Sequence, residues 1–341
     1  MNATTGESSV RSAAPIEEIP ADEALFAEKL RQLLQSKMER DYPKGTMRRD
    51  AHPKHHGCVR AELIVDSGLP PEFAVGVFSE PKTYDAWVRF SNQSGTPQSD
   101  IKGDIRGMAI KLLDVAGPKL LPGAEDCTTH DFILITTDRF VARDVQQFHG
   151  LIAASIAGPM HFALFMLLNW RVARNLWSSL EKFGNILEAT FTSPTPYLLG
   201  QQAVRYRMRP ISPTKTPIPR EPTDNYLRDV MCAHLANREA IFEFLVQVQT
   251  NPERMPIEDP GVRWDETQSP YRRIAALRIP AQRFDSDEQM IFAENLSFNP
   301  WRCLVEHRPL GGINRARKLI YSGLSEFRHD RNGISVKEPA Q

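Results

Sequence analysis

Cysteine is scarce in this chain and shows none of the spacings that bind metals. The four cysteines, Cys58, Cys127, Cys232 and Cys303, lie far apart, and no two of them form a CxxC pair. Closely spaced cysteines mark thiolate metal sites, and regular even sets mark disulfide frameworks. The sequence therefore argues against both and favours a reducing, cytoplasmic location.

An excess of charge of either sign is also missing. Lysine and arginine together number 42, as do aspartate and glutamate, so the formal net charge is 0. A chain without net charge has no overall electrostatic attraction for a polyanion. We therefore expect no nucleic-acid partner.

Long apolar runs are absent as well. The most apolar stretch, 162–170, is far shorter than the roughly 20 residues that a spanning helix needs, and Arg171 and Arg174 follow it closely. We expect a buried or interfacial helix there, which leaves open a peripheral contact of this region with a membrane. Residues 1–22 lack the basic start and apolar core of a secretory signal, and we expect them to form a disordered arm.

The segments that are present indicate strands with helices around them. Helical spacing of apolar residues appears at 23–40, within 142–190 and at 313–329. Short segments rich in β-branched and aromatic residues predict strands at 58–66, 86–91, 107–114, 131–136, 204–210, 241–250 and 273–280. The proline-rich stretch 210–222 indicates a surface loop. Together these segments predict an α+β fold, with helices around one closed or nearly closed antiparallel β-sheet.

The terminal helical segment carries its chemistry on one side. At about 100° per residue, Tyr321, Leu324 and Arg328 all fall within about 40° of Arg317. Two interpretations stay open at this point. The stripe is either an ordinary packed face with arginines along its edge, or it holds a phenol near a cation, which lowers the pKa of the phenol and prepares it to bind a metal.

The amino-terminal half offers polar groups in an unusual place. His52, His55 and His56 lie close in sequence, but the adjacent pair diverges on any regular element, which argues against a dedicated zinc site. In the segment WVRFS, Arg89 and Ser91 share one face of the expected strand, and Val88 and Phe90 share the other. Such a polar pair is costly to bury without partners.

These pieces resemble the haem catalases, in the same order along the chain. The stretch 49–62 resembles the catalase segment that carries the distal histidine, and Val88 to Ser91 is similar to its Val-Arg-Phe-Ser. The catalases also have counterparts of DIRGMAIK, at 104–111, and of the stretch 292–300. Finally, RKLIY, at 317–321, resembles the Arg-x-x-x-Tyr of the proximal iron ligand.

The resemblance implies roles for particular residues. His52 would be the distal acid-base group, oriented by Ser91, and Tyr321 the ligand of ferric haem b, supported by Arg317. The residues that would contact the haem propionates or its faces are Arg49, Arg89, Arg328 and Phe148.

Two positions depart from the family pattern. Ala51 stands where catalases place a valine, and the place of the distal asparagine falls near Ile135 or Thr136, of which only Thr136 can form a hydrogen bond. We therefore expect a roomier distal side and take Thr136 as the third catalytic candidate, with Ala51 beside the cofactor.

The resemblance also implies a fold and a function. We expect a catalase-like antiparallel β-barrel with the proximal helix near the carboxyl terminus, a single haem-binding domain at 23–330 and a tail at 331–341. The short outline is similar to the minimal catalase-related peroxidases, which act on a peroxide with an organic electron donor. A fatty-acid hydroperoxide isomerase and a non-catalytic haem protein remain open as alternatives, as does assembly into a homo-oligomer.

Overall fold

One closed β-sheet organises the computed structural model, which describes residues 17–211, 215–335 and 338–339. Its strands are antiparallel, and β9 pairs with β1 while β5 pairs with β7, so the sheet closes into an eight-stranded barrel. The barrel strands are β1 (His55–Val65), β2 (Thr83–Asn92), β3 (Arg106–Leu112), β4 (His130–Ile135), β5 (Phe191–Thr192), β7 (Gln202–Pro210), β8 (Ala240–Val248) and β9 (Arg272–Ile279). A short extra strand, β6 (Tyr197–Leu199), pairs with β7.

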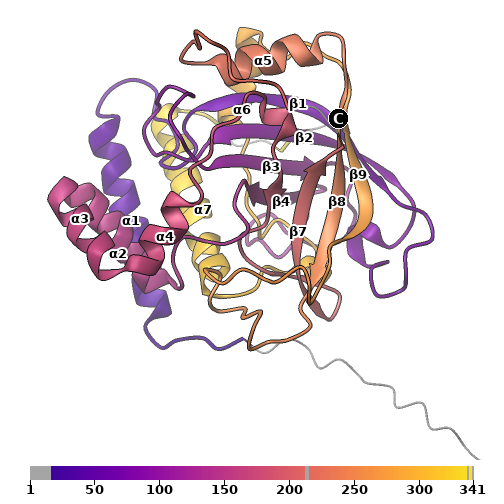
Figure 1. Cartoon of the computed structure of the whole chain (residues 1–341), viewed down its shortest axis with the longest axis horizontal. Coiled ribbons are helices and arrows are strands. Elements are labelled where there is room, and N and C mark those ends of the chain that lie inside the picture. The colour runs from indigo at the N-terminus through magenta and orange to yellow at the C-terminus, as the bar shows by residue number, and fades with distance from the viewer. Residues whose placement is uncertain (1–16, 212–214, 336–337, 340–341) are drawn as a thin grey trace, which may run out of the picture.

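Helices cover the outside of the barrel, and with it they confirm the predicted α+β class. They are α1 (Glu23–Asp41), α2 (Val145–Ala157), α3 (Pro159–Leu168), α4 (Trp170–Trp177), α5 (Tyr226–Leu235), α6 (Asp287–Asn295) and α7 (Gly312–Asn332), with single turns η1 (Gly76–Phe78), η2 (Ile186–Glu188) and η3 (Val305–His307). Helices α1 to α4 gather on one side, and α7 runs between them and the barrel (Figure 1). No helix of the described residues is long and apolar enough to cross a membrane.

Alternation along the strands separates the core from the site. Val88 and Phe90 of β2 belong to the buried cluster inside the barrel, which η1 closes with Phe78. The rings of Phe132 and Phe244 meet there at 5.1 Å between centroids. Arg89 and Ser91, which alternate with Val88 and Phe90 along β2, lie on the outer face of the barrel. Each is nevertheless only 3% exposed, so other elements must cover them.

The expected strands are all present, within a few residues of their predicted ends. Strands β5 and β6 are two and three residues long, too short to show an alternating pattern, and α5 and α6 were not predicted. Helix α6 does carry a sequence signal, because Ser286 and Gln289 form a capping box at its start. The helical block 142–190 is split into α2, α3 and α4, with a break at Gly158, whose φ of 118° is unsuited to a helix.

Both ends of the described chain touch the domain. Residues 1–16 of the expected arm lie outside the described residues, but Glu17 is held on the start of α7, where its Oε1 accepts from the Gly311 amide at 2.8 Å and pairs with Arg315 at 2.6 Å. The expected arm is thus anchored to the domain at Glu17. In the tail, Glu338 pairs with Lys111 and Arg302, each at 2.9 Å.

Candidate functional site

A row of three residues on the outer face of the barrel forms the floor of the candidate site. Ser91 on β2 pairs with Gly107 on β3, which pairs with Ile135 on β4. Directly paired residues of neighbouring strands point to the same face of a sheet. All three therefore face outward, toward the segment that precedes β1.

His52 lies over this row. Its Nδ1 is 2.9 Å from Ser91 Oγ, as the sequence predicted, and a Cβ built on Gly107 would lie 2.6 Å and 2.7 Å from two atoms of its ring. Only glycine at position 107 leaves room for the imidazole. The φ of His52 is 60°, a left-handed conformation that costs a non-glycine residue on the order of 1 kcal/mol and is typical of functional sites.

The surroundings keep the His52 imidazole neutral. Burial, together with the charges of Arg89, Arg49 and Arg317, lowers the pKa of His52 to about 3. When Ser91 Oγ accepts from Nδ1–H, the free lone pair lies on Nε2. At neutral pH, His52 is thus a fixed proton acceptor.

Three arginines meet beside His52 at the end of α6. Arg89 donates to the His52 carbonyl at 3.0 Å and to the Ala293 carbonyl at 3.2 Å. Arg49 and Arg328 both donate to the Glu294 carbonyl, at 3.0 Å and 2.8 Å. The last carbonyls of a helix lack partners within it and favour cations, so this helix end explains how the arginines are positioned.

Positive charge in this arginine cluster (Arg49, Arg89 and Arg328) exceeds the negative charge available to it. The carboxylate beside it is that of Glu294, 3.6 Å from Arg328. Burial and the neighbouring Arg49 hold the pKa of Arg89 well below its usual value and lower that of Arg328 to about 9. Such depressed values show cations that lack counter-charge. The cluster is suited to an anionic ligand, such as the propionates of a haem.

Helix α7 brings Arg317 and Tyr321 to the same region. Arg317 contributes to lowering the pKa of His52, and Arg49 contributes to lowering that of Arg328. Tyr321 lies between Arg317 and Arg328 on one stripe of the helix, with its ring 6.0 Å from the Arg317 guanidinium carbon. Tyr321 therefore shares its stripe of α7 with Arg317, whose charge reaches His52, and with Arg328 of the arginine cluster.

Aromatic residues of α2 and the preceding loop complete the apolar wall. The guanidinium of Arg317 lies 5.6 Å from the Phe140 ring, which in turn packs on Phe148 at 4.9 Å between centroids. Phe148 and Tyr321 belong to one apolar cluster with Ile135. The structure thus brings the predicted Phe148 into the same apolar cluster as Tyr321.

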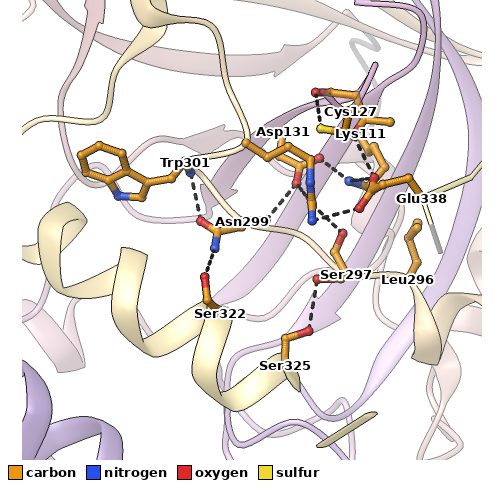
Figure 2. A network of polar contacts seen from close by, with 12 residues as sticks. Lys111, Cys127, Asp131, Leu296, Ser297, Asn299, Trp301, Ser322, Ser325 and Glu338 are labelled. Atoms are coloured by element: carbon orange, nitrogen blue, oxygen red, sulfur yellow. Dashed lines mark hydrogen bonds and ion pairs between the residues drawn. The ribbon is translucent and has the colours of Figure 1, made fainter. Parts of the chain in front are cut away.

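A polar network fixes the rotation of α7 about its own axis (Figure 2). Asn299 Nδ2 donates to Ser322 Oγ at 3.1 Å, and the hydroxyls of Ser297 and Ser325 lie 3.2 Å apart. Asp131 of β4 accepts from the Asn299 amide and from Lys111, each at 2.8 Å. The barrel therefore holds α7 with the stripe that carries Tyr321 in a set orientation.

The structure sets the predicted Thr136 apart from His52. Thr136 Oγ1 accepts from the Arg106 amide at 2.9 Å, and Thr136 lines a separate polar cavity of about 540 Å³. The strand register explains why Thr136 does not face His52. Ile135 is the residue that pairs with Gly107 under His52, and the next residue, Thr136, points the other way. The structure favours Ile135 over Thr136 in the place of the distal asparagine. Ala51 is exposed.

The neighbouring histidines are structural. His56 is fully buried, with its Nε2 2.8 Å from Asn92 Oδ1, and burial lowers its pKa to about 3. Within the described part of the chain, no group of three or more His, Cys, Asp or Glu residues could hold a metal ion.

The sequence missed two parts of the site. Gly107 lies in the DIRGMAIK segment, but nothing in that segment shows that an imidazole lies on it. The carbonyls at the end of α6 hold the arginines, and backbone groups leave no mark in residue type.

Comparison with known proteins shows the same fold. No family model and no curated protein matches the sequence. Among solved structures, a fungal catalase has a TM-score of 0.67 at 16% identity, over 98% of this chain and 68% of that one. Catalase A from Saccharomyces cerevisiae has a TM-score of 0.66 at 15% identity, over 96% of this chain and 68% of that one. A bacterial catalase has a TM-score of 0.63 at 14% identity, over 98% of this chain and 67% of that one. The chain has a catalase-like fold.

Proposed function

We propose that this chain binds haem b and acts on peroxides as a haem-dependent peroxidase or catalase of the short, single-domain type. One juxtaposition carries the proposal: a neutral histidine fixed by Ser91 lies beside an arginine cluster that lacks counter-charge. The catalase-like fold supports the proposal.

The residues present fit a haem. The arginine cluster would neutralise the two propionates, and this would remove the repulsion among its own guanidiniums. The Tyr321 phenolate would be the iron ligand, with the Arg317 guanidinium carbon 6.0 Å from its ring. Phe148 would supply an apolar contact. When bound, haem supplies an iron that binds a peroxide and accepts its oxidising equivalents.

His52 would perform the proton chemistry. Its Nε2 lone pair takes the proton from the peroxide oxygen nearer the cofactor and then delivers it to the departing oxygen. Because burial and the nearby arginines lower the pKa of His52, the imidazole is neutral before the reaction. Ser91 would hold the tautomer, and the Gly107 surface would fix the ring position.

The residues around His52 favour organic hydroperoxides over hydrogen peroxide. Ile135 has no amide to offer to a bound peroxide, and Ala51 presents an exposed methyl next to His52. Apolar surface is worth about 25 cal/mol per Å² to a bulky alkyl group, and hydrogen peroxide gains nothing from it. The same apolar character favours, as a second candidate, a fatty-acid hydroperoxide isomerase that needs no electron donor.

The test is turnover by the purified, haem-loaded full chain. We expect oxidation of a phenolic donor with cumene hydroperoxide, faster than with hydrogen peroxide. His52→Ala should keep its haem and lose about 10²- to 10⁴-fold in rate, whereas His234→Ala, on the distant α5, should change little. Haem without any turnover would contradict the proposal and indicate a carrier, and donor-free rearrangement of a lipid hydroperoxide would indicate the isomerase.

A further inference from the structure

An exposed apolar surface on α3 and α4 takes no part in the candidate site. It consists of large side chains that face solvent: Met160 (81% exposed), Leu164 (55%), Leu167 (77%), Leu168 (72%), Trp170 (66%) and Trp177 (62%). Helix α3 lies at the outer edge of the molecule, away from the barrel (Figure 1). We call these six residues the α3–α4 patch. Contiguous surfaces of this kind mark an interaction site.

The core of the protein does not account for this patch. Helix α3 already packs its other side inward, where Met166 is buried and Phe162 and Phe165 lie against the apolar cluster of α2. A surface helix normally keeps charged or polar residues on its outer side. Helix α3, PMHFALFMLL, has no charged residue on either side, and no described part of the chain covers its exposed leucines.

The charged residues of this stretch are basic. Residues 145–180 contain no aspartate or glutamate and include Arg171 and Arg174. Arg171 is paired with Asp259 at 2.9 Å, so Arg174 is the arginine that we consider for a ligand. The guanidinium of Arg174 lies 5.4 Å from the Trp170 ring, and Trp177 is exposed one turn further on. Tryptophan and arginine at the border of an apolar helical face are typical of helices that lie in a membrane interface.

We propose that the α3–α4 patch docks on the surface of an anionic lipid bilayer. The leucines and Met160 would enter the boundary of the acyl chains, the tryptophans would lie at headgroup depth, and Arg174 would meet a lipid phosphate. A second copy of the chain fits less well, because a twofold interface sets each patch against itself and would bring the Arg174 guanidinium beside Trp170 of one copy toward that of the other.

Binding to vesicles tests the proposal without any reference to haem or turnover. The full chain is sedimented with vesicles of phosphatidylcholine alone and with vesicles that also contain one-third phosphatidylglycerol. We expect binding to the anionic vesicles that weakens at high salt. Emission of the exposed Trp170 and Trp177 should shift to the blue and be quenched by lipids brominated in the upper acyl chain.

Three variants separate the patch from other exposed residues. Leu167→Glu should abolish sedimentation with vesicles. Ile291→Glu, which changes an apolar side chain on α6 that is also exposed (61%), should not. Arg174→Gln should weaken binding to anionic vesicles about fivefold, since one basic residue near such a surface contributes about 1 kcal/mol. Circular dichroism of each variant controls for folding.

Two results would overturn the proposal. One is the absence of vesicle binding by the unmodified chain, together with a concentration-dependent dimer that Leu167→Glu dissociates, which would mean that a second copy covers the patch. The other is equal vesicle binding by Leu167→Glu and Ile291→Glu, which would mean that lipids contact a different surface.

Discussion

Replacing Gly107 by alanine perturbs the site through a single methyl group. The new Cβ would lie 2.6 Å and 2.7 Å from two ring atoms of His52 and 3.1 Å from Ser91 Oγ. Ordinary contacts of this type begin at about 3.4 Å, so the imidazole must move by roughly 0.7 Å or more. Such a shift stretches or breaks the 2.9 Å contact between His52 and Ser91.

The expected effect on turnover is large and the effect on stability modest. A misplacement of about 1 Å in a reacting group can lower the rate about 10²-fold. Overpacking lowers the free energy of unfolding by about 1 to 3 kcal/mol. Alanine offsets part of this loss, because it restricts the conformations of the unfolded chain more than glycine does. We therefore expect kcat/KM for cumene hydroperoxide to fall about 100-fold, with the haem content retained and the melting temperature lowered by a few degrees.

A matched variant and a double-mutant cycle isolate the cause. Gly103→Ala is the control, because its Cβ would meet Leu180 atoms at ordinary distances of 3.4 Å to 3.6 Å. If Gly107 acts only through His52, adding Gly107→Ala to His52→Ala should cause no further loss. Full activity of Gly107→Ala, or a further 100-fold loss in the double variant, would refute the reasoning.

Three further predictions concern the distal side and the buried histidines. Ser91→Ala should leave haem content unchanged and lower kcat at least tenfold, because the imidazole loses its fixed tautomer; an unchanged kcat would assign Ser91 no positioning role. Ala51→Val should depress kcat/KM for cumene hydroperoxide more than for hydrogen peroxide, and equal effects would show that position 51 lies away from the substrate. Burial lowers the pKa of His56 and of His307 to about 3 and that of His130 well below its usual value. These imidazoles are neutral in the folded protein and take up protons below about pH 6.5 once it unfolds, so the three together should lower the free energy of unfolding by about 4 kcal/mol between pH 7.5 and 5.5, and His52, whose pKa is also about 3, adds to this fall. Denaturant titrations at the two pH values measure this difference, and equal midpoints would contradict it.

Periodicity was sufficient to predict the two faces that matter. Alternation predicted that Arg89 and Ser91 share one face of the strand and Val88 and Phe90 the other. In the structure the first pair lies on the outer face of the barrel and the second pair inside it. Helical spacing aligned Arg317, Tyr321 and Arg328. These predictions succeeded because the direction of a side chain within one element depends on sequence spacing alone.

Contacts between elements could not be predicted in the same way. Thr136 was preferred for its hydroxyl, but a shift of one residue along a strand reverses the face, and the register with β3 brings Ile135 to His52 instead. The arginine partners are backbone carbonyls of a helix that the sequence did not reveal. Both features arise from packing between distant segments.

We propose that Tyr321 binds the iron of a haem held by the arginine cluster. The most direct test of this claim is a titration of the purified chain with ferric haem, followed by absorption spectroscopy, for the unmodified chain and for Tyr321→Phe. A phenyl ring has no donor atom, so we expect one haem bound per unmodified chain with a tyrosinate-type spectrum, and weakened binding or an altered spectrum in the variant. An identical spectrum and affinity in Tyr321→Phe would contradict the claim.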